Sequence, residues 1–174
     1  MDIKEIVVSI AMPNERDLEV MDDCIKALQT FEIGYEVNVV SAHRYPKQMI
    51  EYAKNTRPRG IQVIIATASG AAHLPGMIAA FTTLPVIAVP LKSPLLDGLD
   101  SILSMLQMPN GVPVATVSVN GARNAAILAC QIMSLQNKNI VSQMDNLKRH
   151  LVMEVEEQQN HIKQHNNKIG SNSP

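Results

Sequence analysis

The stretch "GIQVIIATASGAAHLPGMIAAFTTLPVIAVPL", residues 60–91, decides the fold. It contains two runs of apolar and β-branched residues, "GIQVIIATA" and "LPVIAVPL", which we predict to be strands. Between them, "AHLPGMIAAFTT" predicts a helix. Two strands separated by a helix form a parallel βαβ unit. Because both strands are continuous apolar runs, we expect a sheet that is covered on both faces.

The same alternation of strand and helix continues on both sides of this unit. Further strands are predicted at residues 3–12, 35–42 and 112–119. Further helices are predicted at residues 17–31, 46–56, 94–108 and 122–135. We therefore expect an α/β three-layer sandwich, with a flavodoxin-like, doubly wound parallel sheet of five strands. In such a fold the ligand binds at the carboxyl ends of the strands.

The character of the chain changes near residue 137. We expect an α/β catalytic domain over residues 1–136 and a helical C-terminal extension with a disordered end over residues 137–174. The extension is polar, with one narrow apolar stripe at Ile140, Met144, Leu147, Leu151 and Val155. His161 and His165 lie one helical turn apart, and we interpret them as solvated residues rather than as a metal pair.

Composition limits the kinds of partner that the chain can have. It has 174 residues, 46% of them hydrophobic, and a net charge of −1. This small charge gives no general attraction to nucleic acid or to an acidic membrane. Acidic residues stand where a basic leader would be, and no apolar run reaches the length of a membrane span. We expect a soluble, cytoplasmic protein, with Cys24 and Cys130 as buried, reduced thiols.

Four loops follow the ends of predicted strands, and each carries residues that a plain core does not need. They are "MPNERD" at 12–17, "SAHRYP" at 41–46, "TASGAAHLPG" at 67–76 and "PLKSPLLDGLD" at 90–100. Carboxyl ends of parallel strands meet at one edge of the sheet, so these loops should converge there.

The second loop contains residue types that can bind an anionic substrate and transfer a proton to or from it. Arg44 can grip a phosphate with a planar fork, and Ser41 can add a hydroxyl donor. His43 can both give and take a proton near neutral pH. The alternative is a surface loop with a capping serine.

The third loop is built from small residues and is followed by His73. Small residues let a ligand approach the backbone, and amides at a helix start attract anions. The alternative is a tight turn with close packing of helix on sheet, which would explain Gly70 but not the histidine.

The fourth loop leads into an apolar helix. Asp97 is a candidate N-cap. Met105, Leu106 and Met108, together with the small-residue helix "GARNAAILACQ", suggest a buried subunit interface.

These motifs carry a resemblance to a known family. The segments "SAHR.P", "ASGAAHLPGM.AA.TTLPVI.VP", "S.L.GLDS.LSM.QMP.GVPVATV" and "NAA.LA.QI" closely resemble the N5-carboxyaminoimidazole ribonucleotide mutase family of purine biosynthesis. The resemblance covers about residues 6–135, and the motifs occur in the family's order.

The resemblance implies a reaction and a site. The family isomerises N5-carboxyaminoimidazole ribonucleotide to the C4-carboxylated form by decarboxylation and recarboxylation, with no metal or other cofactor. His43 would be the general acid and base, while Ser41 and Arg44 hold the phosphate. The third loop would hold the carboxylate or trapped CO2. The residues that this implies for substrate binding are Asn14, Arg16, Asp17, Ser41, Arg44, Ser69, Gly70, Ala71, His73 and Leu74.

The resemblance also implies an assembly. The family forms homo-octamers with sites between subunits, so the loop at residues 96–100 would serve a neighbour's site. The expected partners are a small ribonucleotide substrate and other copies of the chain, with neither nucleic acid nor membrane.

The first loop departs from the family's usual "GSxSD". Its glycine falls on Pro13 and its serines fall on Asn14 and Arg16, while Asp17 is kept. Pro13 has no backbone N–H to donate. The planar guanidinium of Arg16 could replace the contact of a lost serine hydroxyl. Two glycines of the third loop are also replaced, by Thr67 and Ser69.

Three alternatives remain open beside the mutase. The altered first loop favours a non-catalytic relative that binds another phosphorylated metabolite. A second class of the family carboxylates aminoimidazole ribonucleotide directly with CO2, but it typically has "SAHK" and lacks "GAAHLPG". An FMN-binding module would fit the fold but would need aromatic residues for stacking, and these make up only 3% of the chain.

Overall fold

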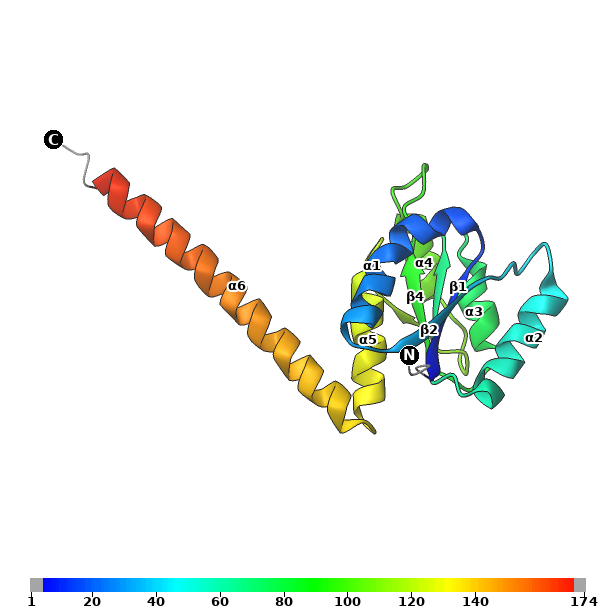
Figure 1. The fold of residues 1–174 in the computed structure, drawn as a ribbon. Helices are drawn as coiled ribbons and strands as arrows, with labels where there is room; N and C mark the ends of the chain where they lie inside the picture. Colours follow the sequence, from blue (N-terminus) through cyan, green and yellow to red (C-terminus); the bar gives the residue numbers. More distant parts are fainter. Residues whose placement is uncertain (1–4, 171–174) are drawn as a thin grey trace. The chain divides into compact units, whose positions relative to one another are not determined.

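A five-stranded parallel sheet forms the centre of the α/β part (Figure 1). The computed structural model describes residues 5–170, with side chains up to residue 166. The strand order is β2-β1-β3-β4-β5. The strands are β1 (Ile6–Met12), β2 (Gly34–Val39), β3 (Val63–Ala68), β4 (Val86–Pro90) and β5 (Ala115–Thr116). This order places the switch point of a doubly wound sheet between β1 and β3.

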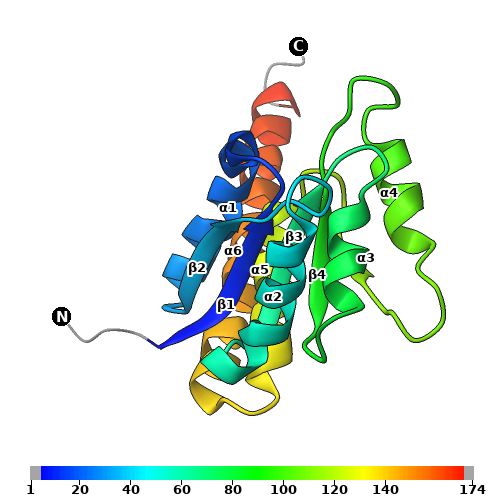
Figure 2. The ribbon, with the colours of Figure 1, turned by 90° about the vertical axis from the view of Figure 1, so that its right-hand side faces the viewer.

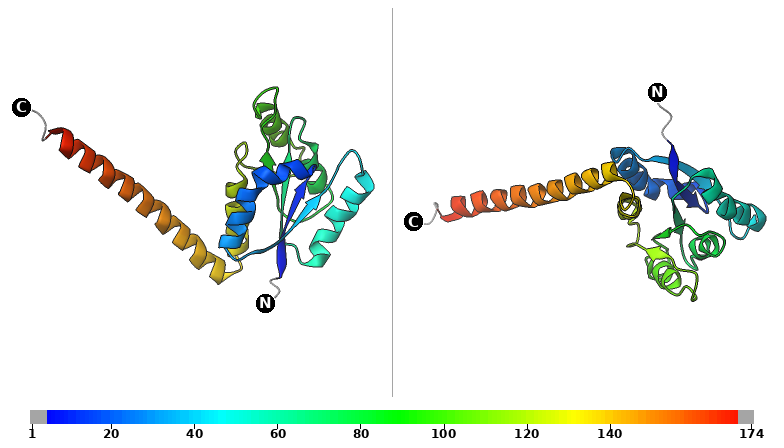
Figure 3. Two further views of the ribbon diagram at one scale, coloured as in Figure 1. Left: turned by 45° about the horizontal axis from the view of Figure 1, so that its top comes forward. Right: turned by 90° about the horizontal axis from the view of Figure 1, so that it is seen from below.

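Helices cover both faces of the sheet. Figure 2 and the end view in Figure 3 show α1 and α5 on one face and α2, α3 and α4 on the other. The helices are α1 (Leu18–Thr30), α2 (Pro46–Thr56), α3 (His73–Ala79), α4 (Leu99–Leu106) and α5 (Ala122–Ser134), with 3₁₀ turns η1 (Glu15–Asp17) and η2 (Arg57–Arg59). The predicted flavodoxin-like sandwich is therefore confirmed.

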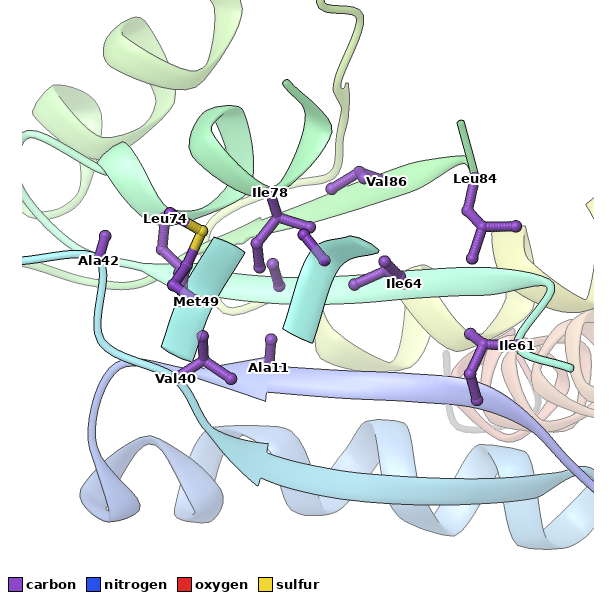
Figure 4. Close-up of a cluster of buried hydrophobic side chains, with 12 residues drawn as sticks. Ala11, Val40, Ala42, Met49, Ile61, Ile64, Leu74, Ile78, Leu84 and Val86 are labelled. Carbon is purple, nitrogen blue, oxygen red and sulfur yellow. The ribbon is translucent and has the colours of Figure 1, made fainter. Parts of the chain in front are cut away.

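The core between the sheet and helices α2 and α3 is apolar. Met49 of α2 and Ile78 of α3 are fully buried against Ile64 of β3 (Figure 4). Every residue of β3 and β4 is buried, as expected for central strands covered on both faces. Burying one such side chain stabilises the fold by about 1.5–3 kcal/mol. This rigid core fixes the strand ends from which the four loops leave.

Several predicted elements are shorter in the structure, and two lose a large part of their predicted length. The strand predicted at 112–119 is paired only at Ala115–Thr116. The helix predicted at 94–108 begins at Leu99, because Asp97 and Gly98 adopt left-handed φ angles of 55° and 97° that no helix continues. The prediction of Asp97 as N-cap is wrong: Gly98 holds that position, and Asp97 instead forms a 2.7 Å ion pair with Lys92.

The chain divides into two compact units, residues 1–133 and residues 134–174. The second unit contains the helix α6 (Lys138–Gly170), which runs without a break for 33 residues. The predicted disorder at the chain end lies outside the described residues. Among the residues described, no cluster of three metal-binding side chains occurs, and no helix is long and apolar enough to cross a membrane.

The two cysteines are buried free thiols, as predicted. Burial raises the pKa of Cys24 to about 12, and the proximity of Cys130 adds to this. Burial likewise raises the pKa of Cys130 to about 12. Both side chains are therefore unreactive thiols near neutral pH.

Candidate functional site

The first and second loops are joined by Arg44. Its Nη2 donates to the backbone carbonyl of Pro13 at 2.8 Å, and its Nε donates to the Ser41 hydroxyl at 3.2 Å. The Ser41 hydroxyl also accepts the Arg44 amide at 3.1 Å. A guanidinium has five N–H donors, so Arg44 can hold both loops and still offer donors to an anion. The proline that replaces the family's glycine is thus in contact with a predicted phosphate ligand.

The second and third loops meet at two histidines. The ring centroids of His43 and His73 lie 4.9 Å apart in an edge-to-face arrangement, with an interplanar angle of 87°. Both side chains are exposed to solvent. Two exposed imidazoles from different strand ends form a place where a substrate can exchange a proton with the protein.

Asp17 joins the first loop to the end of β3. Its carboxylate accepts a 3.2 Å hydrogen bond from Thr67, one of the residues that replace the family's glycines. Burial raises the pKa of Asp17, against the opposing effect of the Thr67 hydroxyl and the Asn14 backbone. The departure at Thr67 therefore supplies a partner for the aspartate that the first loop retains.

The rest of the first loop forms a local turn. The Asn14 side chain accepts the backbone N–H of Arg16 at 3.1 Å and caps η1. This is the capping role that asparagine often takes before a helix. Asn14 and Arg16 are both exposed, at the surface of the site.

The third loop is held against α4 by serines. The Gly70 amide donates to the Ser101 hydroxyl at 2.9 Å, and the Ser104 hydroxyl donates to the Gly70 carbonyl at 3.1 Å. Gly70 has a φ of 63°, and Ala72 follows at 44°, so the chain turns sharply here. The Gly70 amide, predicted as a ligand for a carboxylate, is therefore engaged inside the protein. Ser69 and Ala71 are exposed beside it.

Leu74 lies in a different environment from the other predicted site residues. Its side chain is buried in the core with Met49 and Ile78 (Figure 4). Only its backbone, in the first turn of α3, can face a ligand.

Sequence reasoning missed the supporting roles of Ser101, Ser104 and Asp100. Asp100 accepts a 2.7 Å hydrogen bond from Ser93, which ties the fourth loop to the start of α4. The sequence did carry a signal for these contacts: two serines lie three residues apart in an apolar helix. Serine hydroxyls in such positions often form hydrogen bonds with nearby backbone groups.

Comparison with known proteins places this arrangement in a family. A family model described as AIR carboxylase matches residues 7–154. The chain belongs to the AIR carboxylase family. Within it, the chain is 50% identical to the N5-carboxyaminoimidazole ribonucleotide mutase of Thermotoga maritima, over 90% of this chain and 92% of that protein. It is 55% identical to the protein of the same name from Pyrococcus abyssi, over 76% of each.

Solved structures with the same fold agree with this assignment. The crystal structure of Treponema denticola PurE superposes with a TM-score of 0.83, at 27% identity, and covers 90% of this chain and 98% of that one. A point variant of PurE2 from the same organism gives the same TM-score at 26% identity, with the same coverage of both chains. The predicted family resemblance is therefore confirmed.

Proposed function

We propose that this chain is an N5-carboxyaminoimidazole ribonucleotide mutase acting in purine biosynthesis. The observation that carries the proposal is the convergence of His43, His73, Arg44 and Asp17 at the carboxyl edge of the sheet. Relatives at about half identity over most of the chain bear this name. The geometry supports the proposal: His43 can transfer a proton, Arg44 can bind an anion, and Asp17 can accept a hydrogen bond from a ribose hydroxyl.

His43 is the general acid and base of the proposed reaction. Loss of CO2 from the N5-carboxylate breaks the N–C bond, and His43 gives a proton to the nitrogen. The C4 carbon then attacks the retained CO2, and His43 takes the C4 proton, which restores its starting state. The product is an isomer of the substrate, and no proton is gained or lost overall.

The surrounding residues hold the ionic ends of the substrate. Arg44 and Ser41 bind the phosphate, and Asp17 accepts a hydrogen bond from ribose. Arg16 and Asn14 stand where the family has serines, and the exposed Arg16 guanidinium can form a paired contact with phosphate oxygens.

The third loop holds the carboxylate and the released CO2. Ser69 and Ala71 lie exposed beside His73, and the first turn of α3 presents backbone amides, including that of Leu74. The Gly70 amide takes part only if its bond to Ser101 opens.

Turnover of labelled substrate tests the proposal. Substrate carrying ¹³C in its carboxylate is incubated with purified protein in unlabelled bicarbonate, without added nucleotide triphosphate. We expect the C4-carboxylated product to keep the label, because the CO2 never leaves the site. Product made only from aminoimidazole ribonucleotide and bicarbonate would identify a direct carboxylase, and absence of turnover would identify a non-catalytic relative.

We also propose that the protein is a cytoplasmic homo-octamer. Large apolar side chains are exposed along the fourth loop and one face of α4, at Leu95, Leu96, Leu99, Leu103 and Leu106. Clustered exposed leucines mark interaction surfaces, and contact here would place the fourth loop near a neighbour's site. Analytical ultracentrifugation decides the assembly: a species other than eight chains would contradict it.

A further inference from the structure

Five polar side chains form a connected cluster outside the four loops. Ser9 is completely buried in β1, and its hydroxyl donates to Glu36 at 2.8 Å. The same hydroxyl lies 2.5 Å from the Tyr52 hydroxyl and accepts from Asn38 at 3.3 Å. Glu36 also accepts two bonds from the Arg59 guanidinium, at 2.7 and 2.9 Å. We call these five residues the Ser9 cluster.

The hydrogen bonds of the Ser9 cluster have only one consistent direction. A serine hydroxyl has one proton and two acceptor positions. Its proton goes to Glu36, so Tyr52 and Asn38 must both donate to it. Burial raises the pKa of Tyr52 to about 12, which keeps this donor protonated. Burial alone would raise the pKa of Glu36, but hydrogen bonds from Arg59 and Ser9 outweigh it and lower the pKa, which keeps the acceptor charged.

The Ser9 cluster joins the two elements that flank the second loop. Glu36 and Asn38 lie on β2, which ends just before the loop, and Tyr52 lies on α2, which begins at the last residue of the loop. Arg59 lies in η2, just beyond α2. Ser9 of β1 is the central residue, because its hydroxyl bonds to side chains of both β2 and α2. The cluster therefore fixes where each end of the loop stands.

The other support of the second loop comes from Arg44, which bonds to Pro13 and Ser41, and from two buried side chains. Within residues 40–45 only Val40 and Ala42 are buried, while His43 is exposed. β2 is an edge strand with β1 as its neighbour, and its Val39 is 51% exposed. Because His43 itself is exposed, its position also depends on how firmly β2 and α2 are held together on either side of the loop.

We propose that the Ser9 cluster is a positioning network that sets the second loop, and with it His43, for the reaction. The inference rests on the proposed function. The members of the cluster act through the loop and touch no reacting atom. A displacement of about 1 Å in a catalytic group can lower the rate about a hundredfold. A network that restricts the movement of this loop should therefore have a measurable effect on kcat/KM.

Two variants and a matched control test the network. Tyr52→Phe removes one hydroxyl, and Ser9→Ala removes the central one. The control is Tyr35→Phe, the same substitution on β2, the strand that carries Glu36 and Asn38; there the lost hydroxyl accepts from Gln29 of α1 at 2.9 Å. Hydrogen exchange by mass spectrometry is measured for peptides across residues 40–46 and 69–76, together with kcat/KM and the melting temperature.

We expect faster exchange at residues 40–46 in both cluster variants and unchanged exchange at residues 69–76. The amides of Val40, Arg44 and Tyr45 are hydrogen-bonded and report the loop directly. The value of kcat/KM should fall about tenfold in Tyr52→Phe, the equivalent of one lost hydrogen bond, and further in Ser9→Ala. Tyr35→Phe should match the wild type in both measurements.

Three outcomes would overturn the network. They are cluster variants that behave as Tyr35→Phe does, exchange that rises equally in all peptides, and loop exchange that changes while kcat/KM does not. A wild-type protein without mutase turnover would instead refute the proposed function. In that case the exchange comparison alone still decides whether the Ser9 cluster holds the loop.

Discussion

Asp17 is a carboxylate placed where the protein would be more stable without its charge. Burial raises its pKa above the ordinary 3.8, so the ionised form is less favourable in the folded chain than in the unfolded one. The stability that its neutral form contributes is present below pH 3.8 and is lost as the pH rises through the folded pKa. At neutral pH a charged Asp17 therefore lowers the stability of the fold, which is typical of a residue kept for function.

Asp17→Asn should separate the effect of the Asp17 charge on stability from its effect on activity. We expect a higher melting temperature at pH 7, because an amide oxygen still accepts from Thr67 and the buried charge is gone. The difference should shrink as the pH falls toward 3.8. At the same time kcat/KM should fall about ten- to a hundredfold, because a charge-assisted hydrogen bond to ribose is lost.

An exposed aspartate of α1 provides the control for this substitution. Asp23→Asn removes the same charge from the helix surface. It should change neither kcat/KM nor the melting temperature appreciably. A variant at position 17 that keeps full activity would show that Asp17 does not contact the substrate.

At this scale the sequence predicted which residues come together at the sheet edge, but not their hydrogen-bond partners. His43, Arg44 and Asp17 could be chosen by residue type and by their place after strands. Their contacts could not be predicted, because Arg44 bonds to a backbone carbonyl 31 residues away and Thr67 bonds to an aspartate 50 residues away. Neither contact leaves a periodic pattern in the chain.

Among the elements, α4 depends on a glycine at its start. Gly98 has a φ of 97°, and a Cβ there would lie 2.7 and 2.9 Å from the two methyl carbons of Val119. Gly98→Ala should therefore cost about 1–2 kcal/mol for the left-handed backbone and about 1–3 kcal/mol more for the overlap.

Gly111→Ala isolates the first of these costs. Gly111 has a φ of 89°, but nothing lies within 4 Å of a Cβ built there. Thermal unfolding of both variants measures the difference, which we attribute to Val119. Equal destabilisation would show that α4 can move aside without cost.

The same region shows where element prediction reached its limit. The apolar pattern at residues 94–108 predicted a helix, and half of it is one. The first turn is missing because Asp97 and Gly98 have left-handed φ angles, and Lys92 pairs with Asp97 in the loop before the helix. At β5, β-branched residues predicted an extended chain over 112–119, but pairing with β4 is confined to two residues. Pairing depends on the neighbouring strand and not on propensity alone.

On the scale of the whole molecule, one sheet edge gathers all the proposed chemistry. Strand alternation in the sequence was sufficient to predict the sheet and this edge, because parallel βαβ units have few possible arrangements. The Ser9 cluster was not predicted, although a serine inside a buried strand was a visible signal.

A net charge of −1 offers no strong repulsion between copies, which is compatible with the proposed octamer.

The activity of His43→Asn tests the central claim most directly. The variant keeps a polar side chain on an exposed loop, so it should fold and assemble as the wild type does. We predict that kcat for the interconversion of the two carboxylated ribonucleotides falls by about 10²–10⁴-fold, the usual contribution of a general acid–base group. His150→Asn, on α6, should remain fully active. Wild-type turnover by His43→Asn would contradict the account.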